Sequence, residues 1–251
     1  MNLPFASESD LCAVLEQRLD SLFGQSSSEQ RASTLQQRSV VQVIPDFLYI
    51  RADHPAETVQ TRGLSSVEAA IVAALLPGKP LRLGAIARQL YSRAERVGPR
   101  LRLLEKRGVL ESVRGGAYCI RSDLNWWSVH VIAVEAKLRR WREALHQAVS
   151  YLTFANEAYV ALPSAVVDEN NDLAGAAETA RVGIIAVDEN NATLTREAPY
   201  QSARSADRVW LLSRTVGLPV RSAPSETSTA PRQISGTLAA TRVDDLSLCV
   251  G

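Results

Sequence analysis

Val129-His130-Val131-Ile132-Ala133-Val134-Glu135-Ala136-Lys137 is the stretch that decides the fold of this chain. Its β-branched and apolar residues predict a buried strand. The next residues, 138–152, have helical periodicity, and the helix they predict carries one apolar face. That predicted face consists of Leu138, Trp141, Leu145, Val149 and Leu152. Glu135 and Lys137 lie two apart on the strand and so point to the same side. Because charges are costly to bury without partners, this pair indicates a functional site.

The composition indicates a soluble globular protein. With 251 residues, 46% of them hydrophobic, the chain can bury the core of one large domain or two small ones. No apolar run is long enough to cross a bilayer, and residues 1–5 lack the features of a signal peptide, so we expect a cytoplasmic protein with no membrane partner. The three cysteines are far apart and there are three histidines, which argues against a disulfide framework, a zinc knuckle or a histidine-rich metal site.

Basic residues are concentrated in one segment of a nearly neutral chain. Residues 79–116 contain ten basic and three acidic residues, so this segment carries +7 and the remainder of the chain −6. A local excess of this size attracts phosphate backbones even when the whole protein is close to neutral.

The same segment lies within a pattern typical of a winged helix. Helices are predicted over 65–76, 83–90 and 92–106, the first opened by a capping box at Ser65 and Glu68. A hairpin with a Gly-Gly turn follows over 108–120. In such a domain the third helix enters the major groove of DNA and the hairpin contacts the backbone. The expected DNA-binding residues are Arg93, Arg96, Arg100, Arg102 and Arg114. The alternative is a module that binds another protein.

The remaining elements alternate between helices and strands. A helix over 7–23, capped by Ser7 or Ser9, precedes a strand over 40–50, in which Asp46 is the only acid. Further along, the pattern predicts strands over 158–162, 183–188 and 192–195 and helices over 172–181 and 201–217. Residues 221–251 are rich in Ser, Thr, Pro and Ala without a period, which predicts a disordered or loosely attached tail.

Pro45-Asp46, Val134-Glu135-Ala136-Lys137, the pair Gln147 and Tyr151, and Tyr159-Val160-Ala161-Leu162-Pro163 together resemble the PD-(D/E)xK superfamily of restriction-endonuclease-like nucleases. The resemblance covers residues 7–50 and 124–217. It implies an α/β (α+β) fold class, with a mixed sheet flanked by helices and an inserted winged helix. The implied domains are 1–63 with 122–220, the winged helix over 64–121, and the tail over 221–251.

The resemblance implies hydrolysis of phosphodiester bonds in DNA with Mg²⁺ or Mn²⁺ as cofactor. Magnesium prefers oxygen ligands, and the implied ligands are Asp46, Glu135 and the backbone carbonyl of Ala136. Lys137 would orient the attacking water and stabilise the developing charge. Gln147 and Tyr151 would contact the substrate backbone or brace the site. The acid contributed by the first helix would be Glu8 or Glu16, with Glu16 preferred.

Several alternatives stay open at the level of the sequence. Asp123 lies shortly before the strand and competes with Asp46 as the second carboxylate. Glu135 and Lys137 could also be a solvated pair at a strand end. The protein as a whole could be a catalytically silent DNA-binding or adaptor protein that acts through its winged helix. A homodimer is a possible arrangement for cutting both DNA strands.

Overall fold

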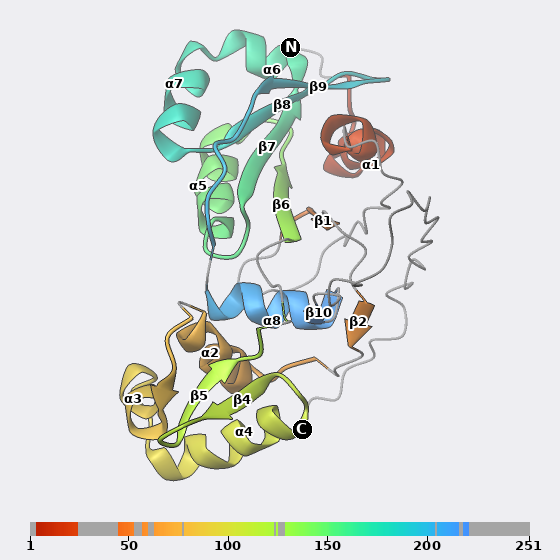
Figure 1. Ribbon diagram of the computed structural model, residues 1–251. Coiled ribbons are helices and arrows are strands. Elements are labelled where there is room, and N and C mark those ends of the chain that lie inside the picture. The colour runs from red at the N-terminus through yellow and green to blue at the C-terminus, as the bar shows by residue number, and fades with distance from the viewer. Residues whose placement is uncertain are drawn as a thin grey trace, which may run out of the picture. The chain divides into compact units, whose positions relative to one another are not determined.

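The computed structural model describes residues 4–24, 45–52, 57–59, 63–76, 78–122, 124, 129–203, 205–215 and 218–220. These residues belong to two units, shown in Figure 1. The described parts of residues 4–52 and 130–201 belong to unit 1, and those of residues 57–129 and 202–220 belong to unit 2. Within the described part of the chain, no helix is both long and apolar enough to cross a membrane.

Unit 1 is built on a five-stranded sheet with the strand order β1-β6-β7-β8-β9. The strands β6, β7 and β8 run parallel to one another, and β9 runs antiparallel to β8. The sheet is therefore mixed, as the resemblance implied. The bounds of its strands are β1 (Phe47–Ala52), β6 (Val129–Ala136), β7 (Glu157–Pro163), β8 (Gly183–Val187) and β9 (Ala192–Arg196).

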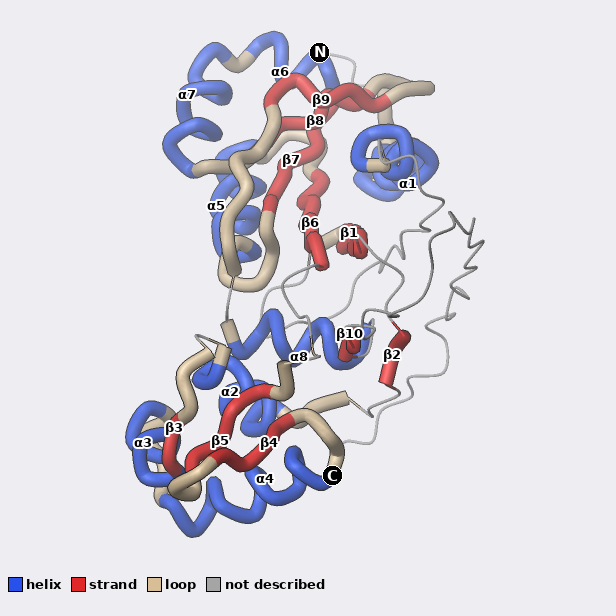
Figure 2. The backbone as a smooth tube through the Cα atoms, in the orientation of Figure 1, coloured by secondary structure: helices blue, strands red, loops and turns tan. Residues whose placement is uncertain are grey.

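Helices cover both faces of this sheet. The helix α5 (Trp141–Tyr151) connects β6 to β7, and α6 (Ser164–Glu169) with α7 (Asn171–Ala180) connects β7 to β8. The helix α1 (Glu8–Phe23) lies on the side opposite α5 (Figures 1 and 2). Its N-cap is Ser7, which forms a capping box with Asp10. The core on this side joins the apolar stripe of α1 to side chains of all five strands. It includes Leu11, Leu15, Leu19, Tyr49, Ile132, Val134, Tyr159, Ala161, Ile185 and Ala192.

The buried face of α5 differs from the predicted one. Val149 was expected to face the core, but 42% of its surface is exposed, whereas Tyr151 is fully buried. The buried residues of the helix are Trp141, Ala144, Leu145, Ala148 and Tyr151. They still follow helical spacing, but the face is rotated toward Ala144, Ala148 and Tyr151, and the Tyr151 hydroxyl reaches Glu135 on β6.

The described residues between 57 and 129, which belong to unit 2, include three helices and a three-stranded antiparallel sheet. These helices are α2 (Ser66–Leu75), α3 (Leu83–Gln89) and α4 (Ala94–Lys106), and the sheet has the order β3-β5-β4. The strands β4 (Leu110–Val113) and β5 (Ala117–Ile120) form the predicted hairpin, with Gly115 and Gly116 at positive φ in its turn. The predicted capping box of Ser65 and Glu68 is present. The strand β3 (Leu81–Arg82) was not predicted, because two residues are too few to show a period.

The helix α8 (Ala206–Thr215) belongs to unit 2, although the sequence assigned it to the domain that contains the mixed sheet. It packs against α2, and the Leu64 N–H donates to Ser213 Oγ at 3.0 Å. Its apolar residues predicted a packed face, but periodicity cannot identify the partner of that face. Unit 2 also contains an unpredicted antiparallel pair, β2 (Glu57–Val59) with β10 (Leu218–Val220). The predicted strand over 40–50 begins at Phe47, and its first residues, like the predicted tail, lie outside the described residues.

Candidate functional site

The carboxyl end of β6 carries an ion pair. Glu135 is buried, with 2% of its surface exposed, and its Oε1 atom lies 2.8 Å from Nζ of Lys137. Lys137 is the first residue after the strand, and its backbone N–H donates to the carbonyl oxygen of Ala161 on β7 at 3.1 Å. The backbone of Lys137 is thus held at this edge of the sheet. In sheets with parallel strands, the carboxyl ends are the usual place for a ligand site.

Asp46 joins this pair from a distant part of the chain. It directly precedes β1, which neighbours β6 in the sheet. Its Oδ2 atom accepts a hydrogen bond of 2.7 Å from the backbone N–H of Ala136. The structure therefore brings Asp46 beside Glu135 and Lys137. Its competitor, Asp123, lies outside the described residues.

The helix α5 supplies two further side chains. The hydroxyl of Tyr151 donates to Oε2 of Glu135, so both oxygens of this carboxylate have partners. Gln147 lies one turn before Tyr151 on the same helix. Its Oε1 atom is buried and has no hydrogen-bond partner among the described residues. A buried acceptor without a partner is uncommon and marks a position where a ligand group can donate.

The first helix contributes Glu8 rather than Glu16. Oε2 of Glu8 lies 3.8 Å from Nζ of Lys137, whereas Glu16 is an exposed residue two turns further along α1. Eight residues of helix correspond to about 12 Å, so one helix cannot place both acids beside one amine. The preference for Glu16 is therefore corrected. Periodicity predicted α1 but could not show which of its ends lies beside β6.

Burial governs the electrostatics of this cluster. It raises the pKa of Asp46, although the hydrogen bond from Ala136 and the charge of Lys137 act in the opposite direction. Burial likewise raises the pKa of Glu135, against the hydrogen bonds from Lys137 and Tyr151. For Lys137, burial is the largest single effect and would lower the pKa, but the hydrogen bond to Glu135 together with the charges of Glu135, Asp46 and Glu8 outweighs it, and the pKa is raised. Lys137 is therefore the charged donor of the cluster at neutral pH.

The neighbouring thiol belongs to the same electrostatic environment. Burial and the charge of Asp46 raise the pKa of Cys12 to about 12, so it stays a neutral thiol. Cys12 lies one helical turn after Glu8 on α1. The sequence assigned it no role, and a lone cysteine among acidic groups gives no signal of one.

The oxygen donors fit a hard divalent cation. Asp46, Glu135 and the carbonyl of Ala136 are oxygen ligands, and the raised pKa values of the two carboxylates reflect a burial cost that a cation would relieve. Among the described residues, no group of three or more His, Cys, Asp and Glu side chains is arranged to hold a metal ion. A cation at this edge would thus depend on two carboxylates and on ligands such as backbone oxygens or water.

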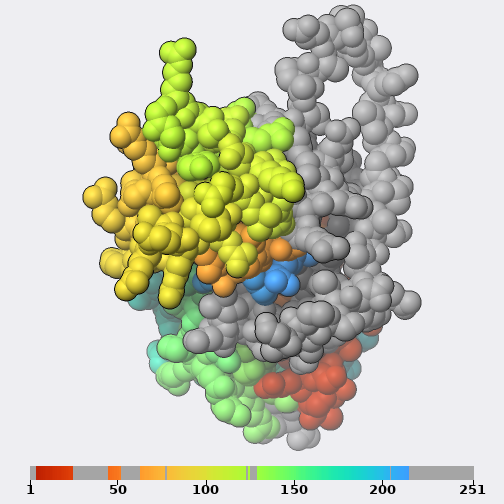
Figure 3. Space-filling model, turned by 90° about the horizontal axis from the view of Figure 1, so that it is seen from below, coloured from red at the N-terminus to blue at the C-terminus, as the bar shows by residue number. Residues whose placement is uncertain are grey.

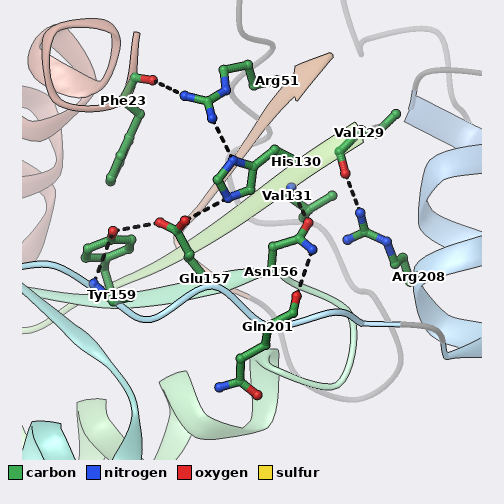
Figure 4. A network of polar contacts seen from close by, with 11 residues as sticks. Phe23, Arg51, Val129, His130, Val131, Asn156, Glu157, Tyr159, Gln201 and Arg208 are labelled. Atoms are coloured by element: carbon green, nitrogen blue, oxygen red, sulfur yellow. Dashed lines mark hydrogen bonds and ion pairs between the residues drawn. The ribbon is translucent and has the colours of Figure 1, made fainter. Parts of the chain in front are cut away.

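A second polar cluster lies at the other end of β6 and β7, and sequence reasoning missed it (Figure 4). Nη2 of Arg51 donates to Nδ1 of His130 at 2.9 Å, and Nε2 of His130 lies 2.9 Å from Oε1 of Glu157. Tyr159 donates to the other oxygen of Glu157 at 2.7 Å. Because a guanidinium can only donate, Nδ1 of His130 carries the lone pair and Nε2 carries the proton. The spacing of Glu157 and Tyr159 on one face of a strand was the available signal.

This second cluster joins several elements of unit 1. Arg51 on β1 also donates to the carbonyl oxygen of Phe23, at the end of α1, at 3.1 Å. Asn156 accepts from the Val131 N–H at 2.9 Å and donates to the Gln201 carbonyl at 2.8 Å. Burial by itself would raise the pKa of Glu157, but the contacts from His130 and Tyr159 outweigh it, and the pKa is lowered. The cluster is therefore a charged brace of the fold.

The five arginines predicted to bind DNA, Arg93, Arg96, Arg100, Arg102 and Arg114, are all exposed. Arg100 is directed toward Glu68, at 3.6 Å, and Arg107 shares the same buried carboxylate at 3.5 Å. Residues two apart on a helix are separated by about 200° around its axis, so Arg100 and Arg102 face different directions. We therefore assign Arg100 partly to the attachment of α4 to α2.

Comparisons with known proteins do not identify a family for this chain. No family model matches it, and no curated protein matches it. One solved structure, a protein of unknown function from Silicibacter pomeroyi, is similar over 45% of this chain and 76% of that one, with 20% identity and a TM-score of 0.26. At this TM-score the similarity supports no statement about fold or function.

Proposed function

We propose that unit 1 is a restriction-endonuclease-like domain that hydrolyses phosphodiester bonds in DNA with the help of a divalent metal ion. The observation that carries this proposal is the meeting of Asp46, Glu135 and Lys137 at one edge of the sheet. Asp46 accepts a hydrogen bond from the backbone N–H of Ala136, which lies 90 positions away in the chain. A solvated Glu-x-Lys pair at a strand end would not need a buried carboxylate, a second acid and a buried tyrosine around it.

The side chains have distinct roles in this proposal. Asp46, Glu135 and the carbonyl of Ala136 would hold the cation. When bound, Mg²⁺ or Mn²⁺ neutralises phosphate charge and lowers the pKa of a coordinated water. Lys137 remains protonated and stabilises the negative charge that develops on the phosphate. Tyr151 fixes the orientation of Glu135, and the unpartnered oxygen of Gln147 is available to a donor on the substrate.

Unit 2 would deliver the DNA. We propose that α2, β3, α3, α4 and the β4–β5 hairpin form a winged helix. The order of its elements, the glycine turn and the exposed Arg93, Arg96, Arg102 and Arg114 support this assignment. Phosphate contacts from such residues position a protein on DNA without reading its sequence.

Cleavage by purified protein tests the proposal. With Mg²⁺ or Mn²⁺, the wild type should nick or cut plasmid DNA, and Glu135→Gln or Lys137→Ala should reduce the rate about 100-fold or more. Both variants should still bind DNA in a gel-shift assay. The matched control is Glu189→Gln, an exposed acid in the turn after β8, which should retain full activity. Unchanged cleavage in the Lys137→Ala variant would contradict the proposed site.

A second candidate is a catalytically silent DNA-binding protein. It is favoured by the engagement of both oxygens of Glu135 by Lys137 and Tyr151, which leaves this carboxylate satisfied without a metal. Wild-type protein that binds DNA but neither cleaves it nor binds Mg²⁺ or Mn²⁺ would establish this candidate and exclude the first.

A further inference from the structure

Tyr91 occupies an unusual position in the turn between α3 and α4. Its side chain is completely exposed, and its φ is +48°, in the left-handed region. The turn is closed by two backbone hydrogen bonds, from Tyr91 N–H to the Arg88 carbonyl at 3.1 Å and from Ser92 N–H to the Ala87 carbonyl at 2.9 Å. This pair of bonds defines a Schellman motif, in which the left-handed position is usually glycine.

A tyrosine at this position destabilises the fold, and the exposed ring contributes no stabilising contact in return. The left-handed conformation brings Cβ too close to the following carbonyl oxygen, a cost that glycine avoids. Apolar burial could offset that cost elsewhere, but a fully exposed ring buries no surface. Strain retained without compensation in the fold is characteristic of positions kept for a contact outside it.

The charges around Tyr91 define what that contact can be. Arg88, Arg93 and Arg96 are all exposed within five residues of it, and Glu95 is the one acid in this stretch of sequence. Figure 3 shows the molecule from below, and the yellow atoms of α4 and its neighbours lie on the face that it shows. An exposed aromatic ring among cationic side chains is the combination that binds nucleic acids, because the ring stacks on bases while the cations hold phosphates.

We propose that Tyr91 stacks on an unpaired base and that Arg88, Arg93 and Arg96 bind the adjoining phosphates. This inference rests on the proposed nucleic-acid binding by unit 2 and narrows its substrate. The faces of bases inside a duplex are covered by their neighbours, so a protruding ring can stack only where a base is open. The preferred substrate is therefore DNA with a single-stranded segment, such as an overhang or a gap.

Fluorescence anisotropy with labelled oligonucleotides tests the inference on the full-length protein. The probes are a blunt duplex, the same duplex with a single-stranded overhang, and the overhang strand alone. Wild type should bind the probes with unpaired bases more tightly than the blunt duplex. Tyr91→Ala should weaken binding to the two probes with unpaired bases by about 5- to 100-fold and leave the blunt duplex unchanged, whereas Tyr91→Phe should bind like wild type.

Two further variants separate this contact from the fold and from the proposed function. Tyr91→Gly should raise the melting temperature while losing the same affinity as Tyr91→Ala, because glycine relieves the strained φ. The double variant Arg93→Ala, Arg96→Ala should weaken binding to all three probes through lost phosphate contacts.

Each outcome decides a separate question. Wild-type binding that Tyr91→Ala leaves unchanged on every probe overturns the stacking inference and leaves the DNA-binding role of unit 2 intact. A loss in Tyr91→Phe equal to that in Tyr91→Ala also overturns it, in favour of a hydroxyl contact to phosphate. A wild type that binds none of the probes overturns the proposed function of unit 2 itself, and the exposed ring would then be assigned to a protein partner.

Discussion

The carboxylate of Asp46 accepts a hydrogen bond of 2.7 Å from the backbone N–H of Ala136, across 90 positions of the chain. This bond fixes Asp46 beside the Glu135–Lys137 pair. It also holds a carboxylate in a place where burial raises its pKa. A raised carboxyl pKa means that the ionised carboxylate is less favourable in the folded protein than in the unfolded chain. The protein is therefore more stable with Asp46 protonated, and that stability is lost as the pH rises through the folded-state pKa.

Asp46→Asn should make the protein more stable and inactive. The asparagine Oδ1 can still accept from the Ala136 N–H, and it carries no charge to bury. At pH 7 the variant should have a higher melting temperature than the wild type. The difference should vanish at a pH below the ordinary aspartate value of 3.8, where both side chains are neutral. Scanning calorimetry across this pH range measures the effect.

The control for this substitution is Asp188→Asn, an exposed aspartate in the turn after β8. It should change neither the melting temperature nor the activity. A lower melting temperature for Asp46→Asn at pH 7 would show that the charge of Asp46 stabilises the fold, contrary to the direction of its pKa shift.

Metal binding should raise the melting temperature of the protein, which can be measured without an activity assay. A ligand that binds only the folded state stabilises it by about 2.7 kcal/mol at a concentration of 100 times its Kd. Saturating Mg²⁺ or Mn²⁺ should therefore raise the melting temperature of the wild type and of Glu189→Gln. The same ions should have no effect on Asp46→Asn or Glu135→Gln. An equal rise in all four proteins would place the cation elsewhere.

The local parts of the fold could be predicted from the sequence. Strand β6, helix α1 and the helices and hairpin of unit 2 show periodicity and capping signals within a few residues, such as Ser65 with Glu68. The pairing of Glu135 with Lys137 follows from the strand alone. These features depend on neighbours along the chain, which a single sequence displays directly.

Contacts between distant segments could not be predicted in the same way. Which acid of α1 reaches Lys137 depends on how the helix crosses the sheet, and periodicity is the same for Glu8 and Glu16. The brace at His130 joins Arg51 and Glu157 from two other strands, and neither residue stands in a motif. The buried face of α5 includes Ala144, Ala148 and Tyr151, which a search for large apolar residues passes over.

Tyr151→Phe should shift the pH dependence of cleavage. The substitution removes the hydroxyl that donates to Glu135, and that bond lowers the carboxylate's pKa against the larger effect of burial. Without it the pKa of Glu135 rises further, so the acidic limb of the rate profile should move to higher pH. Because the variant loses a hydrogen bond to a charged group, its free energy of unfolding should fall by about 1.5–3 kcal/mol.

The readout for Tyr151→Phe is a rate profile at saturating metal, with Tyr200→Phe as control because Tyr200 is an exposed tyrosine of the same unit. A profile of unchanged shape with a uniformly lower rate would mean that Tyr151 acts on the substrate and not through Glu135.

Glu157→Gln should destabilise unit 1 at neutral pH and have little effect in acid. The pKa of Glu157 is lowered, so its charge contributes stability that is present above the ordinary value near 4.5 and is lost as the pH falls through the folded-state pKa. Glutamine preserves the shape of the side chain but not the charge that faces His130 and Arg51. At pH 7 the expected loss in the free energy of unfolding is about 1.5–3 kcal/mol, the scale of a hydrogen bond to a charged group. Denaturant titrations from pH 7 to pH 3 should show the gap between wild type and variant closing, while Glu189→Gln follows the wild type throughout. A gap of constant size down to pH 3 would mean that the loss in the variant does not come from the charge of Glu157.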